Sequence, residues 1–297
     1  MSNTFSALSE GIADAVEKAA ASIVSVAARR HVPASGIVWA PGVIVTADHV
    51  LERDEDIVVT AAGGKQGNAT IAGRDPGSDL ALLRVEGLDL AVAERGGAVR
   101  PGNLVVAVGR AGDEGVTCSV GGVVSLGGPW RTSRGTQVAS YVRSEVTFYP
   151  GYSGGPLIDL EGRVVAVNSS RLGRGGGLSI PVAAAKPLIE SLLATGRIRR
   201  GYLGIGSQPV ALAAAQQAAA GGQETGLLVT GVTAEGPAAT GGVQVGDILY
   251  RLNGVALRDT SDLQGALGPE SVGVAVAASV LRGGASTALT ITVGERV

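Results

Sequence analysis

Ser153 lies in a glycine-rich turn at 151–155, which leads into a largely apolar run at 157–160. A serine hydroxyl is a poor nucleophile at neutral pH, so it needs a base to take its proton and backbone N–H groups to hold the oxyanion that forms. Glycines beside a serine allow the tight backbone that aims N–H groups at one point. Ser153 is a candidate nucleophile if a base and an acid exist elsewhere; otherwise the turn is a Gly-Ser loop without chemistry.

The chain contains two histidines, His31 and His49. His49 follows a strand-like apolar segment at 43–47, and a strand-loop junction can hold a side chain rigidly. His31 stands beside two arginines in polar surroundings, so we expect it on the surface. His49 is therefore the candidate base, with a purely structural histidine as the alternative.

A serine-histidine pair also needs an acid that fixes the imidazole tautomer and stabilises its charged form. Asp79 directly precedes the apolar segment 80–85, which would anchor it at the start of a strand. Asp75 is the competing carboxylate, but Pro76 and Gly77 after it indicate a turn, where an aspartate usually bonds its own backbone. Asp79 fits the role better.

The order of these residues separates two kinds of hydrolase. Residues 151–155 also match the G-x-S-x-G pattern of α/β-hydrolases, which place their histidine after the serine. No histidine follows His49. The α/β-hydrolase fold is therefore excluded, and the order His, Asp, Ser is that of chymotrypsin.

Composition limits the class of protein. With 297 residues the chain is long enough for two domains, and 45% hydrophobic against 17% charged residues indicates a globular protein. A net charge of −2 argues against a general nucleic-acid binder. Cys118 is the only cysteine, which excludes an internal disulfide.

Several motifs are missing from the sequence. It has no Walker-type phosphate loop, and we expect no cofactor and no metal site. No apolar run reaches the roughly 18–20 residues of a membrane span. The first ten residues carry no basic residue and no apolar core of a secretion signal. We therefore expect a cytoplasmic location for the sequence as given, unless an export segment has been removed from it.

Short, evenly spaced strand-like segments predict a mainly β fold of antiparallel barrels. A helix is expected at 182–195, ended by Gly196. The basic segment after it marks the best boundary, which gives a first domain at 1–196, a linker at 197–201 and a second domain at 202–297. In the second domain two short helices are expected, at 237–240 and 260–267.

Three sequence motifs, in the order His, Asp, Ser, resemble those of a known protease family. Residues 46–50 (Thr-Ala-Asp-His-Val), 79–83 (Asp-Leu-Ala-Leu-Leu) and 150–157 (Pro-Gly-Tyr-Ser-Gly-Gly-Pro-Leu) resemble those of the HtrA/DegP-type trypsin-like serine proteases. The likeness covers nearly the whole chain. It implies a chymotrypsin-like double six-stranded antiparallel β-barrel with the active site in the cleft between the barrels.

The resemblance also implies roles for single residues. His49 would act as general base and then general acid, Asp79 would orient it, and Ser153 would attack the scissile carbonyl. The N–H groups of Gly151 and Ser153 would form the oxyanion hole. The family usually has Asn where this chain has Tyr152; we expect this side chain to point away from the oxyanion hole and to alter contacts in the cleft.

By the same likeness, Thr147 occupies the position that carries an acid in trypsin-like enzymes, which argues against cleavage after Lys or Arg. A small or medium apolar P1 side chain is the expected preference. The resemblance implies a substrate pocket lined by Thr147, Phe148, Asn168, Ser169, Ser170 and Arg171.

The C-terminal part resembles a single PDZ domain, a partly open β-barrel with two helices. The segments that carry this likeness are 202–205, 226–229, 236–239, 246–249 and 252–254. In such domains the first segment would present N–H groups to a peptide's C-terminal carboxylate, and the peptide adds a strand to the sheet edge. The carboxylate-binding candidates are Tyr202, Leu203, Gly204 and Ile205, with Leu263 and Leu267 facing the peptide side chain.

The sequence thus predicts an ATP-independent serine endopeptidase that cleaves unfolded or damaged proteins and binds C-terminal peptides through its PDZ domain. Family likeness implies a homotrimer, for which Phe5 and an apolar N-terminal helix are the only hints. The alternative is a proteolytically silent chaperone or adaptor that uses the cleft and the PDZ groove for binding only.

Overall fold

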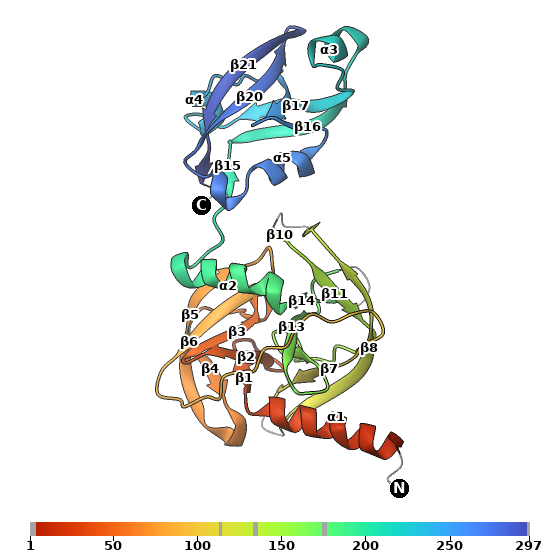
Figure 1. Cartoon of the computed structure of the whole chain (residues 1–297). Coiled ribbons are helices and arrows are strands. Elements are labelled where there is room, and N and C mark those ends of the chain that lie inside the picture. Colours follow the sequence, from red (N-terminus) through yellow and green to blue (C-terminus); the bar gives the residue numbers. More distant parts are fainter. Residues whose placement is uncertain (1–3, 113–114, 133–135, 174–176, 296–297) are drawn as a thin grey trace. The chain divides into compact units, whose positions relative to one another are not determined.

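The computed structural model describes residues 4–112, 115–132, 136–173 and 177–295. The chain divides into two compact units, residues 1–198 and 199–297, which Figure 1 shows. Separate hydrophobic clusters fill the two units.

The first unit contains two closed six-stranded antiparallel barrels. In the first barrel the strand order is β1-β2-β3-β6-β5-β4. Its strands are β1 (Ile23–Ala27), β2 (Ala34–Ala40), β3 (Val43–Ala47), β4 (Ile57–Thr60), β5 (Gln66–Asp75) and β6 (Leu80–Val85). Two short 3-10 helices, η1 (Asp48–Val50) and η2 (Ala62–Gly64), follow β3 and β4.

In the second barrel the strand order is β11-β14-β13-β12-β7-β8. Its strands are β7 (Leu104–Gly109), β8 (Thr117–Gly127), β11 (Tyr141–Ser144), β12 (Pro156–Ile158), β13 (Val164–Ser169) and β14 (Leu178–Pro181). The short strands β9 (Trp130–Arg131) and β10 (Gln137–Val138) pair with each other. The predicted double six-stranded barrel is confirmed.

Apart from Thr46 in β3 and the exposed Arg84 in β6, these two strands are apolar without alternation because both of their faces are buried. Successive side chains of a strand point to opposite faces. Ile44 and its partner Leu83 belong to the core inside the first barrel. Val45 and its partner Leu82 belong to a second core, which the two barrels share. The same two strands therefore stabilise both cores.

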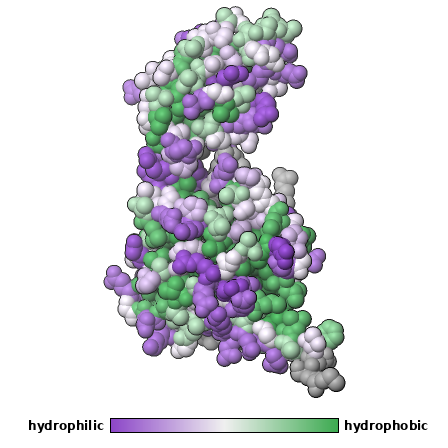
Figure 2. Space-filling model, in the orientation of Figure 1, coloured by the Kyte–Doolittle hydropathy of each residue, from purple (hydrophilic) through white to green (hydrophobic). Residues whose placement is uncertain are grey.

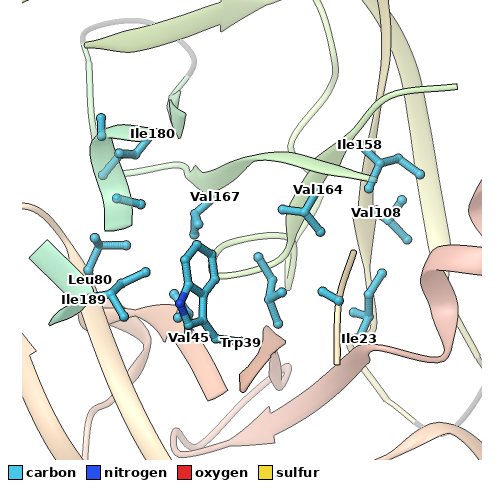
Figure 3. Packing of buried hydrophobic residues seen from close by; sticks show 14 of the residues in the cluster. Ile23, Trp39, Val45, Leu80, Val108, Ile158, Val164, Val167, Ile180 and Ile189 are labelled. Carbon is cyan, nitrogen blue, oxygen red and sulfur yellow. The ribbon is translucent and has the colours of Figure 1, made fainter. Parts of the chain in front are cut away.

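The shared core joins the two barrels. Figure 3 shows Trp39 and Leu80 from the first barrel in one cluster with Val167 and Ile180 from the second. Ile189 from the helix α2 (Val182–Thr195) completes this cluster. Fully burying each such side chain contributes on the order of 1.5–3 kcal/mol, so the relative position of the barrels is well determined.

Two helices pack on the barrels. The helix α1 (Thr4–Ala20) buries only two alanines, Ala15 and Ala19, on its inner face. The helix α2 ends as predicted at Gly196, whose φ of 73° is left-handed and whose N–H bonds the Leu192 carbonyl at 2.8 Å. No helix in the described ranges is long and apolar enough to cross a membrane.

The second unit is built on a sheet with the strand path β16-β17-β18-β20-β21, with β19 paired to β18. Its strands are β15 (Gly201–Tyr202), β16 (Ile205–Ala211), β17 (Thr225–Val232), β18 (Ile248–Leu252), β19 (Val255–Ala256), β20 (Ala275–Arg282), β21 (Ala285–Thr292) and β22 (Gly294–Glu295). Its helices are α3 (Ala214–Ala219), α4 (Pro237–Thr240), α5 (Thr260–Ala266) and the 3-10 helix η3 (Pro269–Ser271). The two predicted helices correspond to α4 and α5.

Candidate active site

Antiparallel pairing of β3 with β6 brings His49 and Asp79 together. Ala47 at the end of β3 faces Leu80 at the start of β6, so the residues just beyond these two positions meet. The Asp79 carboxylate lies 2.8 Å from Nδ1 of His49 and also accepts the His49 backbone N–H at 3.0 Å. An ionised carboxylate only accepts hydrogen bonds, so Nδ1 carries the proton and the lone pair of the neutral ring is on Nε2.

Ser153 reaches the site from the second barrel, on the loop between β11 and β12. Antiparallel pairing places Pro156 at the start of β12 opposite Val167 near the end of β13. The loop before β12 therefore lies beside the residues that end β13. Ser170, the residue after β13, contacts Ser153 for this reason.

Ser169, the last residue of β13, links the barrels at the site. Its hydroxyl donates a hydrogen bond to Oδ2 of Asp79, and the side chain is buried. The Asp79 carboxylate thus accepts hydrogen bonds from His49 in the first barrel and from Ser169 in the second. Such a carboxylate is held in one orientation, which in turn holds the imidazole.

The hydroxyl of Ser153 is bonded to Ser170. The two Oγ atoms are 2.8 Å apart, and the Ser170 N–H donates to the Ser153 Oγ at 3.2 Å. Within the described part of the chain, no hydrogen bond joins Ser153 to His49. Catalytic hydrogen bonds are often long or poorly aligned without substrate, so Ser153 and His49 remain candidates for a serine-histidine pair.

Across the described residues, two backbone N–H groups of the Ser153 loop donate no hydrogen bond, that of Gly151 and that of Ser153 itself. The neighbouring N–H groups of Tyr152, Gly154 and Gly155 are all occupied by backbone carbonyls. Buried N–H groups without a partner are rare, and a pair of them beside a nucleophile suits a developing oxyanion.

A cavity opens at these groups. Its lining residues are Arg29, His31, Val32, His49, Glu52, Phe148, Tyr149, Pro150, Gly151, Ser153 and Ser170. His31 is exposed, as predicted, and borders this cavity. Among the described residues, no group of His, Cys, Asp and Glu side chains could hold a metal ion.

Only some of the residues predicted for the substrate pocket line the cavity. Phe148 and Ser170 line the cavity. Thr147 and Arg171 are exposed and do not line it. Asn168 is fully buried within the second barrel, where its side chain bonds backbone and side-chain groups.

Tyr152 points away from the cavity, as expected, and its ring is 1% exposed inside the second barrel. The ring of Tyr149 packs edge-to-face against the ring of Tyr152, with 5.6 Å between the two ring centroids. A Cβ on Gly109 would lie 2.6 Å from the Tyr152 ring, so glycine at this position makes room for it. We expected Tyr152 to alter contacts in the cleft. Its side chain instead lies inside the second barrel and anchors the loop there.

Burial raises the pKa of Tyr152. The Thr117 side chain is near enough to oppose this rise. No contact to the buried Tyr152 hydroxyl within the described ranges has the geometry of a hydrogen bond. The ring therefore contributes through packing, whereas its hydroxyl contributes little.

Two further contacts at the site have no signal in the sequence. Ser35 in β2 bonds the backbone of the Ser153 loop. Arg74 in β5 donates from Nε to Asp48, the neighbour of His49, at 2.7 Å. Both contacts depend on which strands are neighbours in the barrels, and spacing along the chain does not reveal this.

In the second unit, the segment predicted to bind a carboxylate joins the end of β15 at Tyr202 to the start of β16 at Ile205. The carbonyls of Leu203 and Gly204 accept hydrogen bonds from Ala238 and Thr233 at 2.8 and 2.7 Å. A trans peptide directs its N–H opposite to its C=O, so the N–H groups of Gly204 and Ile205 point away from these partners.

The strand that follows this segment, β16, pairs only with β17 and leaves its other edge unpaired among the described strands. The helix α5 packs against β16. Leu263 of α5 is buried in the core of the unit, and Leu267 is half-buried against it. The unit thus has an open strand edge beside a helix, an arrangement that can accept an extended peptide.

Each of the two units matches a known family model. A family model described as a trypsin-like peptidase domain matches residues 34–167, and a PDZ domain model matches residues 201–293. The three residues His49, Asp79 and Ser153 lie within the first match. The chain is thus a trypsin-like peptidase domain combined with a PDZ domain.

Relatives of this chain carry serine endoprotease names. The chain is 34% identical over 265 residues to a "Probable periplasmic serine endoprotease DegP-like" of Pseudomonas fluorescens. The aligned region covers 87% of this chain and 55% of that relative. A protein of the same name from Halomonas elongata is 30% identical over 276 residues, covering 90% of this chain and 57% of the relative. The chain spans little more than half the length of these curated relatives.

Solved structures match over nearly their whole length. An HtrA-type protease AlgW with a decapeptide has a TM-score of 0.77 at 25% identity, covering 96% of this chain and 99% of that one. A serine endoprotease from Yersinia pestis has a TM-score of 0.76 at 27% identity, covering 96% and 98%. The chain belongs to the HtrA family of trypsin-like peptidases with a PDZ domain.

Proposed function

We propose that this protein is an ATP-independent serine endopeptidase that cleaves unfolded or damaged proteins. In this proposal Ser153 is the nucleophile, His49 the general base and Asp79 the residue that orients it. The observation that carries the proposal is the buried Asp79 carboxylate on Nδ1 of His49, with Ser153 bordering the same cavity from the other barrel. The names of the relatives and of the solved structures support the same activity.

The chemistry follows from the proton on Nδ1. Nε2 of His49 takes the proton of the Ser153 hydroxyl while Oγ forms a bond to the scissile carbonyl carbon. The carbonyl electron pair moves to oxygen, where the N–H groups of Gly151 and Ser153 stabilise it. His49 then protonates the leaving amine as the C–N bond breaks. Water, deprotonated by His49, hydrolyses the acyl-enzyme in the same way.

A small or medium apolar side chain is the proposed P1 preference. Phe148 lines the cavity, and Thr147 offers no acid for a Lys or Arg substrate. The proposed pocket also includes three residues that do not line the cavity in this structure, Asn168, Ser169 and Arg171.

We also propose that the PDZ unit binds C-terminal peptides. Tyr202, Leu203, Gly204 and Ile205 would hold the carboxylate, and the peptide would pair with the open edge of β16. The peptides in the solved HtrA-type structures support this proposal.

A homotrimer is the proposed assembly. Apolar side chains are exposed on the first unit at Phe5 and Leu8 of α1 and at Val120, Val124 and Leu126 of β8. Figure 2 shows apolar residues gathered over the edge of this unit that β8 occupies in Figure 1. Mass photometry of the purified chain tests this: a trimer mass supports it and a monomer at micromolar concentration contradicts it.

Two finer proposals concern boundaries and location. We propose a peptidase domain at 1–196, a linker at 197–201 and a PDZ domain at 202–297. The relatives' names are those of periplasmic proteins. They support an extracytoplasmic location rather than the cytoplasmic one expected from the first ten residues.

The test is proteolysis of an unfolded model protein without ATP, with cleavage sites mapped by mass spectrometry. The wild-type chain should cut the unfolded protein and spare its native form, and Ser153→Ala should cut neither. Binding of the unfolded protein without any cleavage by the wild type would instead establish the binding-only alternative.

A further inference from the structure

Ser35 is fully buried in β2, and all of its polar groups are engaged. Its hydroxyl donates to the Gly151 carbonyl at 2.6 Å and accepts the Arg110 N–H at 2.8 Å. Its backbone N–H donates to the Ser153 carbonyl at 3.3 Å, and its own carbonyl accepts the hydroxyl of Thr46 at 2.8 Å. One residue of the first barrel thus bonds both ends of the Gly151–Ser153 segment of the second.

These bonds orient the Gly151–Tyr152 and Ser153–Gly154 peptides, which adjoin the peptides that carry the Gly151 and Ser153 N–H groups. In a trans peptide the N–H is opposite the C=O. With the Gly151 carbonyl on Ser35, the Tyr152 N–H points the other way and bonds Tyr149 at 3.1 Å. With the Ser153 carbonyl on Ser35, the Gly154 N–H points the other way and bonds Asn168 at 2.9 Å. The N–H groups left without a partner are those of Gly151 and Ser153.

The glycines of the loop have the matching role. A Cβ on Gly154 would lie 2.4 Å from the Ser35 carbonyl oxygen, and a Cβ on Gly155 would lie 3.0 Å from the Ser35 Cβ. Both glycines are needed for the loop to approach Ser35 this closely. The Gly-Gly pair after the nucleophile is therefore part of the same contact.

Arg110 fixes the other side of Ser35. Arg110 is 7% exposed, and its guanidinium donates to the carbonyls of Ile23 and Ala20 at 2.8 and 3.0 Å. These two bonds anchor Arg110 to the end of α1 and the start of β1. The Arg110 N–H is thereby held at the distance at which it bonds the Ser35 hydroxyl.

We infer that Ser35 is a positioning residue that holds the Gly151–Ser153 segment so that its two free N–H groups are ready for the oxyanion. This inference rests on the proposed peptidase function. It gives a role to a residue that lies outside the three sequence motifs at 46–50, 79–83 and 150–157. Without the hydroxyl, the Gly151 carbonyl and the Arg110 N–H lose a buried partner. Among the described residues, the Gly151–Tyr152 peptide, which adjoins both peptides that carry the free N–H groups, is then held only through its Tyr152 N–H. Catalysis should then suffer more than substrate binding.

The test compares Ser35→Ala with Ser25→Ala in the full chain, using a peptide substrate and measuring kcat, KM and Tm. Ser25 is a matched control: it lies on β1 directly opposite Ser35, is equally buried, and makes no side-chain hydrogen bond within the described ranges. We expect Ser35→Ala to lower kcat about ten- to hundredfold with KM changed less than about threefold. Ser25→Ala should leave both near the wild-type values.

Ser35→Cys replaces the hydroxyl with a somewhat larger thiol that is a weaker donor, so its kcat should fall between those of the wild type and Ser35→Ala. This variant decides if Ser35→Ala does not fold. An unchanged kcat in a folded Ser35 variant overturns the positioning role and leaves the peptidase function standing. A fall in Tm alone, with kcat unchanged, does the same. No turnover by the wild-type chain overturns the peptidase function and the positioning role together.

Discussion

The backbone at Gly151 adopts a φ of 94°, a conformation that L side chains rarely take. A Cβ here would also lie 2.4 Å from the Ala111 Cβ. Gly151→Ala should therefore displace the N–H proposed to bind the oxyanion and lower kcat about 10²–10³-fold, the cost of losing one such donor. Peptide hydrolysis measures this.

Gly63→Ala is the matched control for that variant. Gly63 also has a positive φ, 81°, but a Cβ there would meet nothing within 4 Å. Activity equal to wild type in Gly63→Ala and in Gly151→Ala would show that the N–H at Gly151 takes no part in the reaction.

The Ser170 hydroxyl bonds the hydroxyl of Ser153, the proposed nucleophile. Attack requires the Ser153–Ser170 hydrogen bond to break, at a cost of about 1 kcal/mol for a typical hydrogen bond. Ser170→Ala should therefore raise the rate of labelling by a fluorophosphonate roughly fivefold. A slower rate would mean that Ser170 assists Ser153 instead of restraining it.

At the scale of elements, the loop that carries Ser153 is anchored to β7 through Tyr152. Gly109→Ala should push the ring out of its place, since the new Cβ would overlap it, and should lower both Tm and activity. Tyr152→Ala should cost about 3–5 kcal/mol of unfolding free energy, as for other large buried aromatics. Chemical denaturation of the full chain measures this.

Tyr152→Phe is the control for these two variants. Because the Tyr152 hydroxyl is buried without a properly formed hydrogen bond among the described residues, its removal should be neutral or slightly stabilising. A loss comparable to that of Tyr152→Ala would show that the hydroxyl, and not the ring, anchors the loop.

The arrangement of elements explains which parts of the site the sequence could predict. His49 and Asp79 could be found because each follows or precedes an apolar strand, and pairing of those strands makes them neighbours. Ser35 and the anchoring of Tyr152 could not, because those contacts join strands that are distant in sequence. Asn168 illustrates the converse: motif likeness places it in the pocket, but its side chain bonds inside the barrel.

Asp75 shows what local chemistry can predict. The turn after it suggested that this aspartate bonds its own backbone, and its carboxylate accepts the Ser78 N–H at 2.7 Å. It also accepts the Thr136 hydroxyl at 3.0 Å, a contact between the barrels that the turn did not indicate.

At the scale of the whole molecule, the two units should respond differently to acid. In the second unit, burial alone would raise the pKa of Asp247, but hydrogen bonds from Arg282 and from the Gln244 N–H outweigh it and hold this pKa below its usual range. The stabilisation from Asp247 is therefore present above about pH 4, the unfolded value, and is lost as the pH falls towards the folded value.

Hydrogen exchange of residues 199–297 in the full chain should show protection falling in this acid range. Arg282→Met should already weaken protection at neutral pH, because it removes both side-chain bonds to Asp247. Both tryptophans, Trp39 and Trp130, lie in the first unit, so their fluorescence reports that unit separately. Protection independent of pH in the wild type would contradict the role given to Asp247.

We propose that one cavity between the two barrels holds an activated serine. Labelling of the native chain with a fluorophosphonate, with the modified residue located by mass spectrometry, tests this directly. We expect a single modification at Ser153 that is lost in Ser153→Ala and strongly slowed in His49→Ala. Labelling at another serine, or none in a folded wild-type chain, would contradict it.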